Sequence, residues 1–185
     1  WLRLPPPHGI HEVRVNQLPN TGGAGDRRCH RGGRDHVILR QVSSPVAVYV
    51  HTPFCPSKCG YCDFNSYAME GDIIPRTVAA MEREIRNSPD AGRPAKTIFF
   101  GGGTPTFLSA EQLTGLLRAV IETHPPIPGA EITSEANPGT VDMPKFDAMR
   151  EAGFNRISLG AQSFSAPDLI RLGRVHEADH IARAV

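Results

Sequence analysis

Hydrophobic and polar residues are distributed differently in two parts of the chain. Residues 1–44 are rich in proline, glycine, arginine and histidine, and their hydrophobic residues follow neither a helix nor a strand period. A segment of this kind buries too little apolar surface to offset the entropy that it would lose on folding. We therefore expect residues 1–44 to be a disordered or spurious extension and residues 45–185 to form the folded part.

Four short hydrophobic runs in the second part predict β-strands. They cover residues 46–50, 96–100, 131–135 and 156–160, and β-branched and aromatic residues are frequent in most of them. Each run is too short for a helix and is followed closely by glycine, proline or other polar loop residues. The runs are therefore interpreted as short, buried strands.

Between these runs, hydrophobic residues recur every three or four positions, which is typical of one face of an amphipathic helix. The first such segment covers about 74–87, with Pro75 in its first turn. The second follows Ser109 and Gln112, whose spacing is that of a capping box, and ends before Pro125. Its hydrophobic stripe consists of Leu113, Leu116, Leu117, Val120 and Ile121.

Three further helices are expected in the last third of the chain. One covers about 144–152, with Gly153 at its carboxyl end, where glycine is the favoured cap. A short helix begins after Ser165, which is spaced to form a capping box with Asp168. A last helix begins at Glu177 and continues to the end of the chain.

Alternating strands and helices predict an α/β fold with a parallel sheet and right-handed crossovers. Each predicted strand leads into a loop of unusual residues, and barrel enzymes place their sites at the carboxyl ends of strands. We therefore expect part of a TIM-like (β/α) barrel with about four β/α units. Four strands cannot close a barrel, and the chain begins at Trp1 rather than methionine, so we expect a truncated sequence.

The amino-acid composition limits the partners and the cellular compartment that we expect for the protein. The formal net charge is +1, with 20 Lys and Arg against 19 Asp and Glu, which gives no reason to expect nucleic acid as a partner. The longest hydrophobic runs are a few residues, so stable membrane insertion is not expected, and no apolar signal segment precedes them. We expect a cytoplasmic protein, because reduced thiols persist in that compartment.

Three of the four cysteines, Cys55, Cys59 and Cys62, follow the first predicted strand in a C-x3-C-x2-C spacing. Three neighbouring thiolates can hold three irons of a cubane iron–sulfur cluster and leave the fourth iron open to an outside ligand. A zinc site with His51 as fourth ligand is an alternative, although zinc sites usually present two separated pairs. Disulfides would leave one thiol over. Cys29 lies far from the group and is interpreted as incidental.

The other strand ends carry candidate ligand-binding residues. Consecutive glycines at 101–103 would let the backbone approach a ligand and point amide hydrogens at it, or would simply form a tight turn. Glu135 would accept hydrogen bonds from a ribose or an ammonium group, or form an ordinary salt bridge. Gln162 could bond an adenine or carboxylate edge, and Arg174 could clamp a carboxylate, although both types more often stabilise loops or surfaces.

The cysteine spacing, with the aromatic Tyr61 before the third cysteine, resembles the radical S-adenosylmethionine (SAM) superfamily. The resemblance implies that Cys55, Cys59 and Cys62 hold a [4Fe-4S] cluster, whose open iron is chelated by the amino and carboxylate groups of SAM. It further implies that the glycine segment binds the amino group of SAM through backbone groups.

Within this superfamily the chain is most similar to the family of oxygen-independent coproporphyrinogen III oxidase and the haem chaperone HemW. The matching segments are 49–55, 101–105, 135–138 and 172–176, and the resemblance covers about the N-terminal half of such a protein, so 45–185 would be part of a truncated core domain. By position, the resemblance places one SAM at Tyr49, Gly102 and Glu135. It places a second SAM, known in the oxidase, at Tyr61, Gly103, Thr104, Gln162 and Arg174.

One position favours the haem-chaperone branch of this family. The oxidases carry a fourth cysteine two residues after the third, whereas this chain has Phe64, as HemW-type proteins do. The resemblance then implies haem, an unidentified haem-acceptor protein and a reductant such as flavodoxin as partners. The alternative is an oxidoreductase that oxidatively decarboxylates coproporphyrinogen III in haem biosynthesis. No residue is singled out as catalytic, and the segment that HemW-type proteins use for haem lies downstream of this sequence.

Overall fold

The computed structural model describes residues 44–174 and 176–184. The expected extension at 1–44 therefore lies, except for its last residue, outside the described residues, and so does Cys29. A four-stranded parallel sheet in the order β1-β4-β5-β6 forms the centre of the described part. Its strands are β1 (Val46–Thr52), β4 (Ala95–Gly102), β5 (Pro126–Ala136) and β6 (Arg156–Leu159). All four predicted strands and their parallel arrangement are confirmed.

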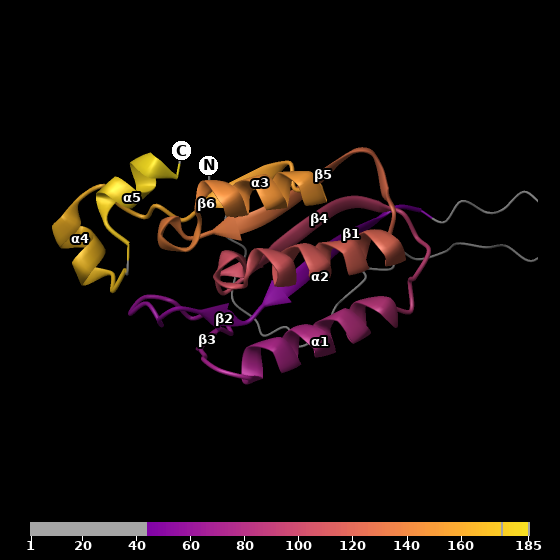
Figure 1. The fold of residues 1–185 in the computed structure, drawn as a ribbon, viewed down its shortest axis with the longest axis horizontal. Helices are drawn as coiled ribbons and strands as arrows, with labels where there is room; N and C mark the ends of the chain where they lie inside the picture. Colours follow the sequence, from indigo (N-terminus) through magenta and orange to yellow (C-terminus); the bar gives the residue numbers. More distant parts are fainter. Residues whose placement is uncertain (1–43, 175, 185) are drawn as a thin grey trace, which may run out of the picture.

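Three helices connect the strands and lie in a row along one face of the sheet (Figure 1). They are α1 (Ile73–Arg86), α2 (Ala110–Thr123) and α3 (Met143–Ala152), close to the predicted ranges. Placement on one face is what right-handed crossovers between neighbouring parallel strands produce. The α/β architecture is therefore as predicted, and four strands leave the sheet open within the described residues, as expected for part of a barrel.

Local sequence signals determine where two of these helices begin or end. At α2 the Ser109 hydroxyl accepts from the Gln112 amide and the Gln112 side chain accepts from the Ser109 amide, both at 3.1 Å. These two bonds form the predicted capping box. After α3, Gly153 has a φ of 116°, a left-handed conformation that glycine adopts without a Cβ clash.

The end of the described chain differs from the prediction at two helices. The short helix α4 (Ala166–Arg171) begins after Ser165 as expected, but the Ser165 side chain forms no cap. Ser163 replaces it: its hydroxyl donates to Asp168 at 3.3 Å and accepts from the Ser165 amide at 3.1 Å. Helix α5 (Ala178–Arg183) begins after Glu177 and ends before the chain does.

A second, two-stranded parallel sheet was not predicted. It pairs β2 (Phe54–Cys55) with β3 (Tyr67–Ala68). Strands of two residues are too short to show a hydrophobic period. The pairing brings together the two ends of the loop that carries the cysteines. Short 3₁₀ turns at Pro105–Phe107 and Pro138–Thr140 follow β4 and β5.

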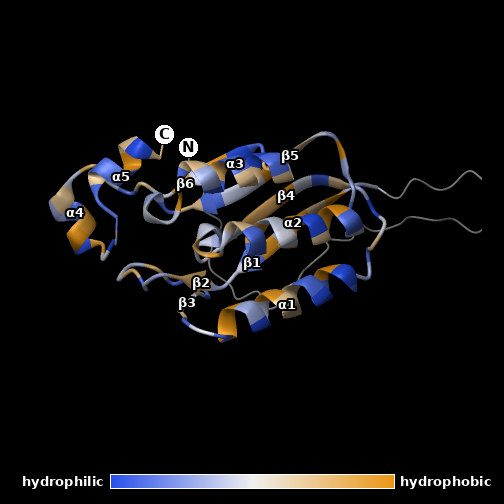
Figure 2. Ribbon diagram, in the orientation of Figure 1, coloured by the Kyte–Doolittle hydropathy of each residue, from blue (hydrophilic) through white to orange (hydrophobic). Residues whose placement is uncertain are grey.

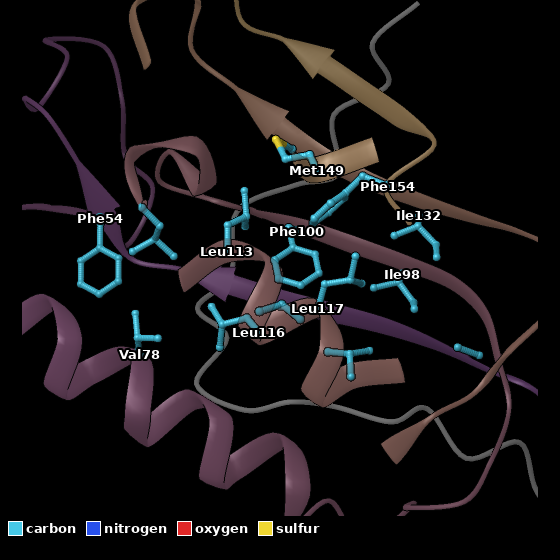
Figure 3. Packing of buried hydrophobic residues seen from close by; sticks show 14 residues of the cluster. Phe54, Val78, Ile98, Phe100, Leu113, Leu116, Leu117, Ile132, Met149 and Phe154 are labelled. Carbon is cyan, nitrogen blue, oxygen red and sulfur yellow. The ribbon is translucent and has the colours of Figure 1, made fainter. Parts of the chain in front are cut away.

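The hydrophobic core lies between the sheet and its helices. Figure 2 shows hydrophobic and hydrophilic residues alternating along the helices, and Figure 3 shows the buried side chains that fill the space between the layers. Phe100 of β4 is fully buried and meets Phe154 edge to face, with ring centroids 5.2 Å apart. Phe54 is also fully buried in this core, near Val78 of α1. The start of the cysteine loop is therefore anchored in the main core.

The predicted stripe of α2 is confirmed as the part of that helix which faces the core. Four of its five members, Leu113, Leu116, Leu117 and Val120, have no exposed surface, and Ile121 is partly buried. Each such side chain contributes roughly 1.5–3 kcal/mol of burial free energy. No helix among the described residues is long and apolar enough to cross a membrane.

Replacing Phe100 by alanine should lower the free energy of unfolding by about 3–5 kcal/mol, because it leaves a cavity between β4 and α2. Phe164→Ala is the matched control, since Phe164 is 74% exposed and its loss should cost within about 0.5 kcal/mol. Urea unfolding followed by circular dichroism measures both values. Equal losses for the two variants would contradict the core described here.

Candidate functional site

A cavity of about 520 Å³ lies where the carboxyl ends of the parallel strands meet the cysteine loop. Residues from the loops after β1, β4, β5 and β6 contribute to its wall, so the four strand ends converge as the sequence predicted. The predicted site residues that line it are Cys55, Cys59, Tyr61, Cys62, Gly102, Gly103, Thr104, Glu135, Gln162 and Arg174. Tyr49 is not among the lining residues.

The path of the cysteine loop is held by a lysine that sequence reasoning missed. Lys58 lies between the first two cysteines, and its Nζ donates to the carbonyl oxygens of Phe64 at 2.7 Å and Ser66 at 3.2 Å. The Cys62 amide also donates to the Cys59 carbonyl at 3.1 Å. A lysine in a loop gives no sequence signal for such a role, because solvated lysines are far more frequent there.

The three loop cysteines are free thiols, each partly buried. Two of the sulfurs accept side-chain hydrogen bonds: Thr104 Oγ1 lies 3.6 Å from Cys55 Sγ, and Arg174 Nη1 lies 3.6 Å from Cys59 Sγ. Within residues 44–174 and 176–184, no three Cys, His, Asp or Glu side chains converge on one point as the ligands of a single ion do. Cubane ligands have a different arrangement, because each thiolate binds its own iron.

His51 is hydrogen-bonded through both ring nitrogens, which argues against the zinc alternative. Its Nε2 donates to the Asn65 carbonyl at 2.8 Å, so its Nδ1 is the acceptor for the Tyr49 hydroxyl at 3.2 Å. A zinc ligand needs a free imidazole nitrogen, and one of these bonds would have to break to provide it. His51 instead ties β1 to the far side of the cysteine loop.

The glycine triplet is required by close packing. A Cβ on Gly103 would lie 2.4 Å from the Phe54 carbonyl oxygen, and one on Gly102 would lie 2.6 Å from the His51 ring. Gly102 also has a φ of 107°, which side chains rarely tolerate. The turn and ligand-contact interpretations are therefore compatible, because Gly102 and Gly103 form a tight turn and also line the cavity.

The expectation that the glycine amides point at a ligand is wrong for two of them. The Gly102 amide donates to Glu135 Oε2 at 3.2 Å, and the Gly103 amide donates to the Thr52 carbonyl at 2.7 Å. Both hydrogens are therefore used inside the protein. An ammonium group of a ligand needs acceptors in any case, and these are carbonyl and carboxylate oxygens.

Glu135 is held at the cavity by this backbone bond and not by a cation. Burial raises the pKa of Glu135 above its ordinary value of 4.5, while the Gly102 amide and the nearby His51 partly offset that rise. A carboxylate whose main partner is an amide keeps lone pairs for a ligand. Among the described residues, the geometry around Glu135 therefore favours the binding of a ligand over an ordinary salt bridge.

Tyr49 lies beside the site and does not line the cavity. Its ring stacks on Phe99, with centroids 6.1 Å apart, and its hydroxyl donates to His51. Burial, together with the charge of Glu135, raises the pKa of Tyr49 to about 12. The phenol therefore keeps its proton and donates to His51, and its contact with a ligand stays a prediction.

Gln162 and Arg174 are built into the site. Gln162 has a φ of 66°, a left-handed conformation that costs a residue with a side chain roughly 1–3 kcal/mol and that clusters at functional sites. Arg174 Nη2 donates to the Gly160 carbonyl at 2.8 Å, and its Nη1 reaches the Tyr61 hydroxyl at 3.4 Å. Its Nε is buried and has no partner among the described residues. Arg174 therefore stabilises the loop after β6 and also lines the cavity, whereas Gln162 lines the cavity with an exposed side chain.

Comparison with known proteins identifies the family. The family model of the radical SAM superfamily matches residues 49–185, which include the cysteine loop and every strand end described above. The chain belongs to the radical SAM superfamily. Membership implies a [4Fe-4S] cluster and SAM as ligands, and the three thiols around one cavity, with donors at two of the sulfurs, fit such a cluster.

Individual relatives refine the comparison. The chain is 43% identical over 145 residues to the heme chaperone HemW of Escherichia coli and 41% identical over 134 residues to that of Bacillus subtilis. These alignments cover 76% and 71% of this chain and 38% and 35% of the relatives, so the chain spans less than two fifths of their length. It also superposes on the radical SAM enzyme coproporphyrinogen III oxidase (HemN) of E. coli, with a TM-score of 0.69 and 28% identity. That superposition covers 77% of this chain and 34% of the oxidase.

Replacing Gly103 by alanine should lower the free energy of unfolding by about 1–3 kcal/mol, because the Cβ would overlap a backbone oxygen that cannot move alone. Gly60→Ala is the matched control from the cysteine loop, since nothing lies within 4 Å of its Cβ position. Urea unfolding of both variants tests the difference. A Gly103→Ala protein as stable as the Gly60→Ala protein would contradict the packing argument.

Replacing Glu135 by glutamine should stabilise the protein at pH 7 and change nothing at low pH. Because its folded-state pKa is raised, the wild-type carboxyl contributes stability that is fully present below its unfolded-state pKa. That contribution is lost as the pH rises through the folded-state pKa. Glutamine does not ionise, so the variant keeps its stability at pH 7.

Unfolding free energies at pH 7 and at about pH 4 measure this effect, the lower value lying below the ordinary pKa of a glutamate. Glu84→Gln, on the exposed side of α1, is the matched control at both pH values. If Glu135→Gln changes the unfolding free energy by the same amount at both pH values, the ionisation of Glu135 is not the cause of the change.

Proposed function

We propose that this chain is the cluster-binding and SAM-binding part of a HemW-like haem chaperone, which binds haem and transfers it to an acceptor protein. The observation that carries the proposal is Phe64. It lies two residues after Cys62, where the similar oxidases have a fourth cysteine, and its exposed side chain lines the cavity. The higher sequence identity to the HemW relatives than to the oxidase supports the same choice.

In this proposal Cys55, Cys59 and Cys62 hold the [4Fe-4S] cluster. When bound, such a cluster supplies the electron that cleaves a C–S bond of SAM. Two observations support the assignment: the thiols line one cavity, and Lys58 holds their loop in a defined path. A reductant of the flavodoxin type and a cytoplasmic location would suit an oxygen-sensitive cluster.

SAM would occupy the part of the cavity between the glycine turn and the loop after β6. Glu135, whose main partner is a backbone amide, would accept from the SAM ammonium or ribose. Carbonyl groups of Gly102 and Gly103 would complete the contact with the ammonium. Tyr49, which lies close enough to Glu135 for the charge of that carboxylate to act on it, would contact the same SAM.

A second ligand site would use the residues on the other side of the cavity. Tyr61, Gly103, Thr104, Gln162 and Arg174 all line it, and the guanidinium of Arg174 is the group there that suits a ligand carboxylate. The superposition on the oxidase supports an alternative function, the oxidative decarboxylation of coproporphyrinogen III. In that case the chain would be part of an enzyme of haem biosynthesis.

Two measurements on the complete gene product test the proposal. After anaerobic reconstitution, the wild type should contain about four irons and four sulfides per chain. Cys55→Ser should lose the cluster, while Cys29→Ser is the matched control and should keep it. One tightly bound zinc without sulfide would overturn the cluster assignment.

The second measurement separates the chaperone from the oxidase. Haem titration followed by absorbance should show stoichiometric binding, and incubation with coproporphyrinogen III, SAM and a reductant should form no protoporphyrinogen. Transfer of the bound haem to an apo-haem protein would support the chaperone further. Turnover of coproporphyrinogen III would overturn this choice and establish the oxidase activity.

A further inference from the structure

Two of the three loop thiols are contacted by hydrogen-bond donors that come from other parts of the sheet edge. Thr104, which follows β4, donates to Cys55 Sγ, and Arg174, which follows α4, donates to Cys59 Sγ, each over 3.6 Å. No corresponding side-chain donor to Cys62 is present in the described part of the chain. The three sulfurs are therefore in different electrostatic environments.

Both donors are held in place by bonds that do not involve the sulfurs. The Thr104 amide donates to the Phe54 carbonyl at 2.6 Å, and the residue is 8% exposed, so its hydroxyl has little freedom to turn elsewhere. The Gly103 amide donates to the Thr52 carbonyl at 2.7 Å, so a second backbone bond holds the same turn. Thr104 is therefore preorganised toward Cys55.

Arg174 is preorganised in a different way. Its Nη2 is bonded to the Gly160 carbonyl at 2.8 Å, which leaves Nη1 directed at Cys59 Sγ and the Tyr61 hydroxyl. The turn that carries it is packed against the cysteine loop, because the Cβ position of Gly173 lies 3.6 Å from the Gly60 amide nitrogen. The planar guanidinium can make these contacts together, whereas a lysine ammonium cannot.

We propose that Thr104 and Arg174 set the reduction potential of the cluster by donating hydrogen bonds to the sulfurs of Cys55 and Cys59. The inference rests on the cluster assignment proposed above and adds a role to both residues besides any contact with SAM. Hydrogen bonds to cluster sulfurs stabilise the more negative, reduced state and so raise the potential. Thr104 and Arg174 are positioning and tuning residues in this proposal and do not react.

The experiment measures the midpoint potential of the reconstituted [4Fe-4S] cluster, without SAM, by reductive titration followed with electron paramagnetic resonance. Thr104→Val, which keeps the shape and removes the donor, should shift the potential to a more negative value. Thr104→Ser, which keeps the hydroxyl, should stay near the wild-type value. Arg174→Lys and Arg174→Gln should both shift it in the negative direction, because neither can keep the fork of bonds.

Arg171→Gln is the control for charge alone, since it removes a positive charge from the exposed end of α4 and should leave the potential unchanged. Wild-type potentials for Thr104→Val and Arg174→Lys would overturn the inference, as would equal shifts for Arg174→Gln and Arg171→Gln. If an Arg174 variant fails to take up the cluster, the midpoint potential of the near-isosteric Thr104→Val variant tests the inference. A wild type without iron and sulfide would instead contradict the proposed function.

Discussion

The site depends on how closely the end of β4 approaches the start of the cysteine loop. The amides of Gly103 and Thr104 donate to the carbonyl groups of Thr52 and Phe54, at 2.7 and 2.6 Å. That approach leaves no room for a Cβ at Gly103. Since Phe54 is also fully buried in the main core, the same two bonds connect the loop to the hydrophobic core.

This connection explains why residues with different chemistry share one cavity. Once the loop is joined to β4, the parallel register brings the ends of β5 and β6 alongside it, and with them Glu135 and the loop of Gln162. The acid lies where the glycine amide can hold it, and the turn after α4 closes the opposite side with Arg174. Thiols, carboxylate and guanidinium thus face a common space although they are spread over 120 residues of sequence.

Local signals in the sequence were sufficient for most of the elements. The strands, the stripe of α2, the capping box at Ser109 and the glycine cap at Gly153 all depend on residues within a few positions of each other. Contacts outside these local patterns were not predicted. The β2–β3 pair, which joins residues thirteen positions apart in segments without a period, was not predicted, and the local capping box expected at Ser165 is replaced by a bond between Ser163 and Asp168.

By itself the sequence determined the α/β architecture and the family and named the candidate site residues, because periodicity, capping and motif spacing are properties of neighbouring residues. Only the tertiary structure decided how those residues are used. It directed two of the glycine amides into the protein, joined the Tyr49 hydroxyl to His51, and aimed Thr104 and Arg174 at two sulfurs. Such contacts arise from the crossing of strand ends that lie far apart in the chain, and no local pattern encodes the distance between them.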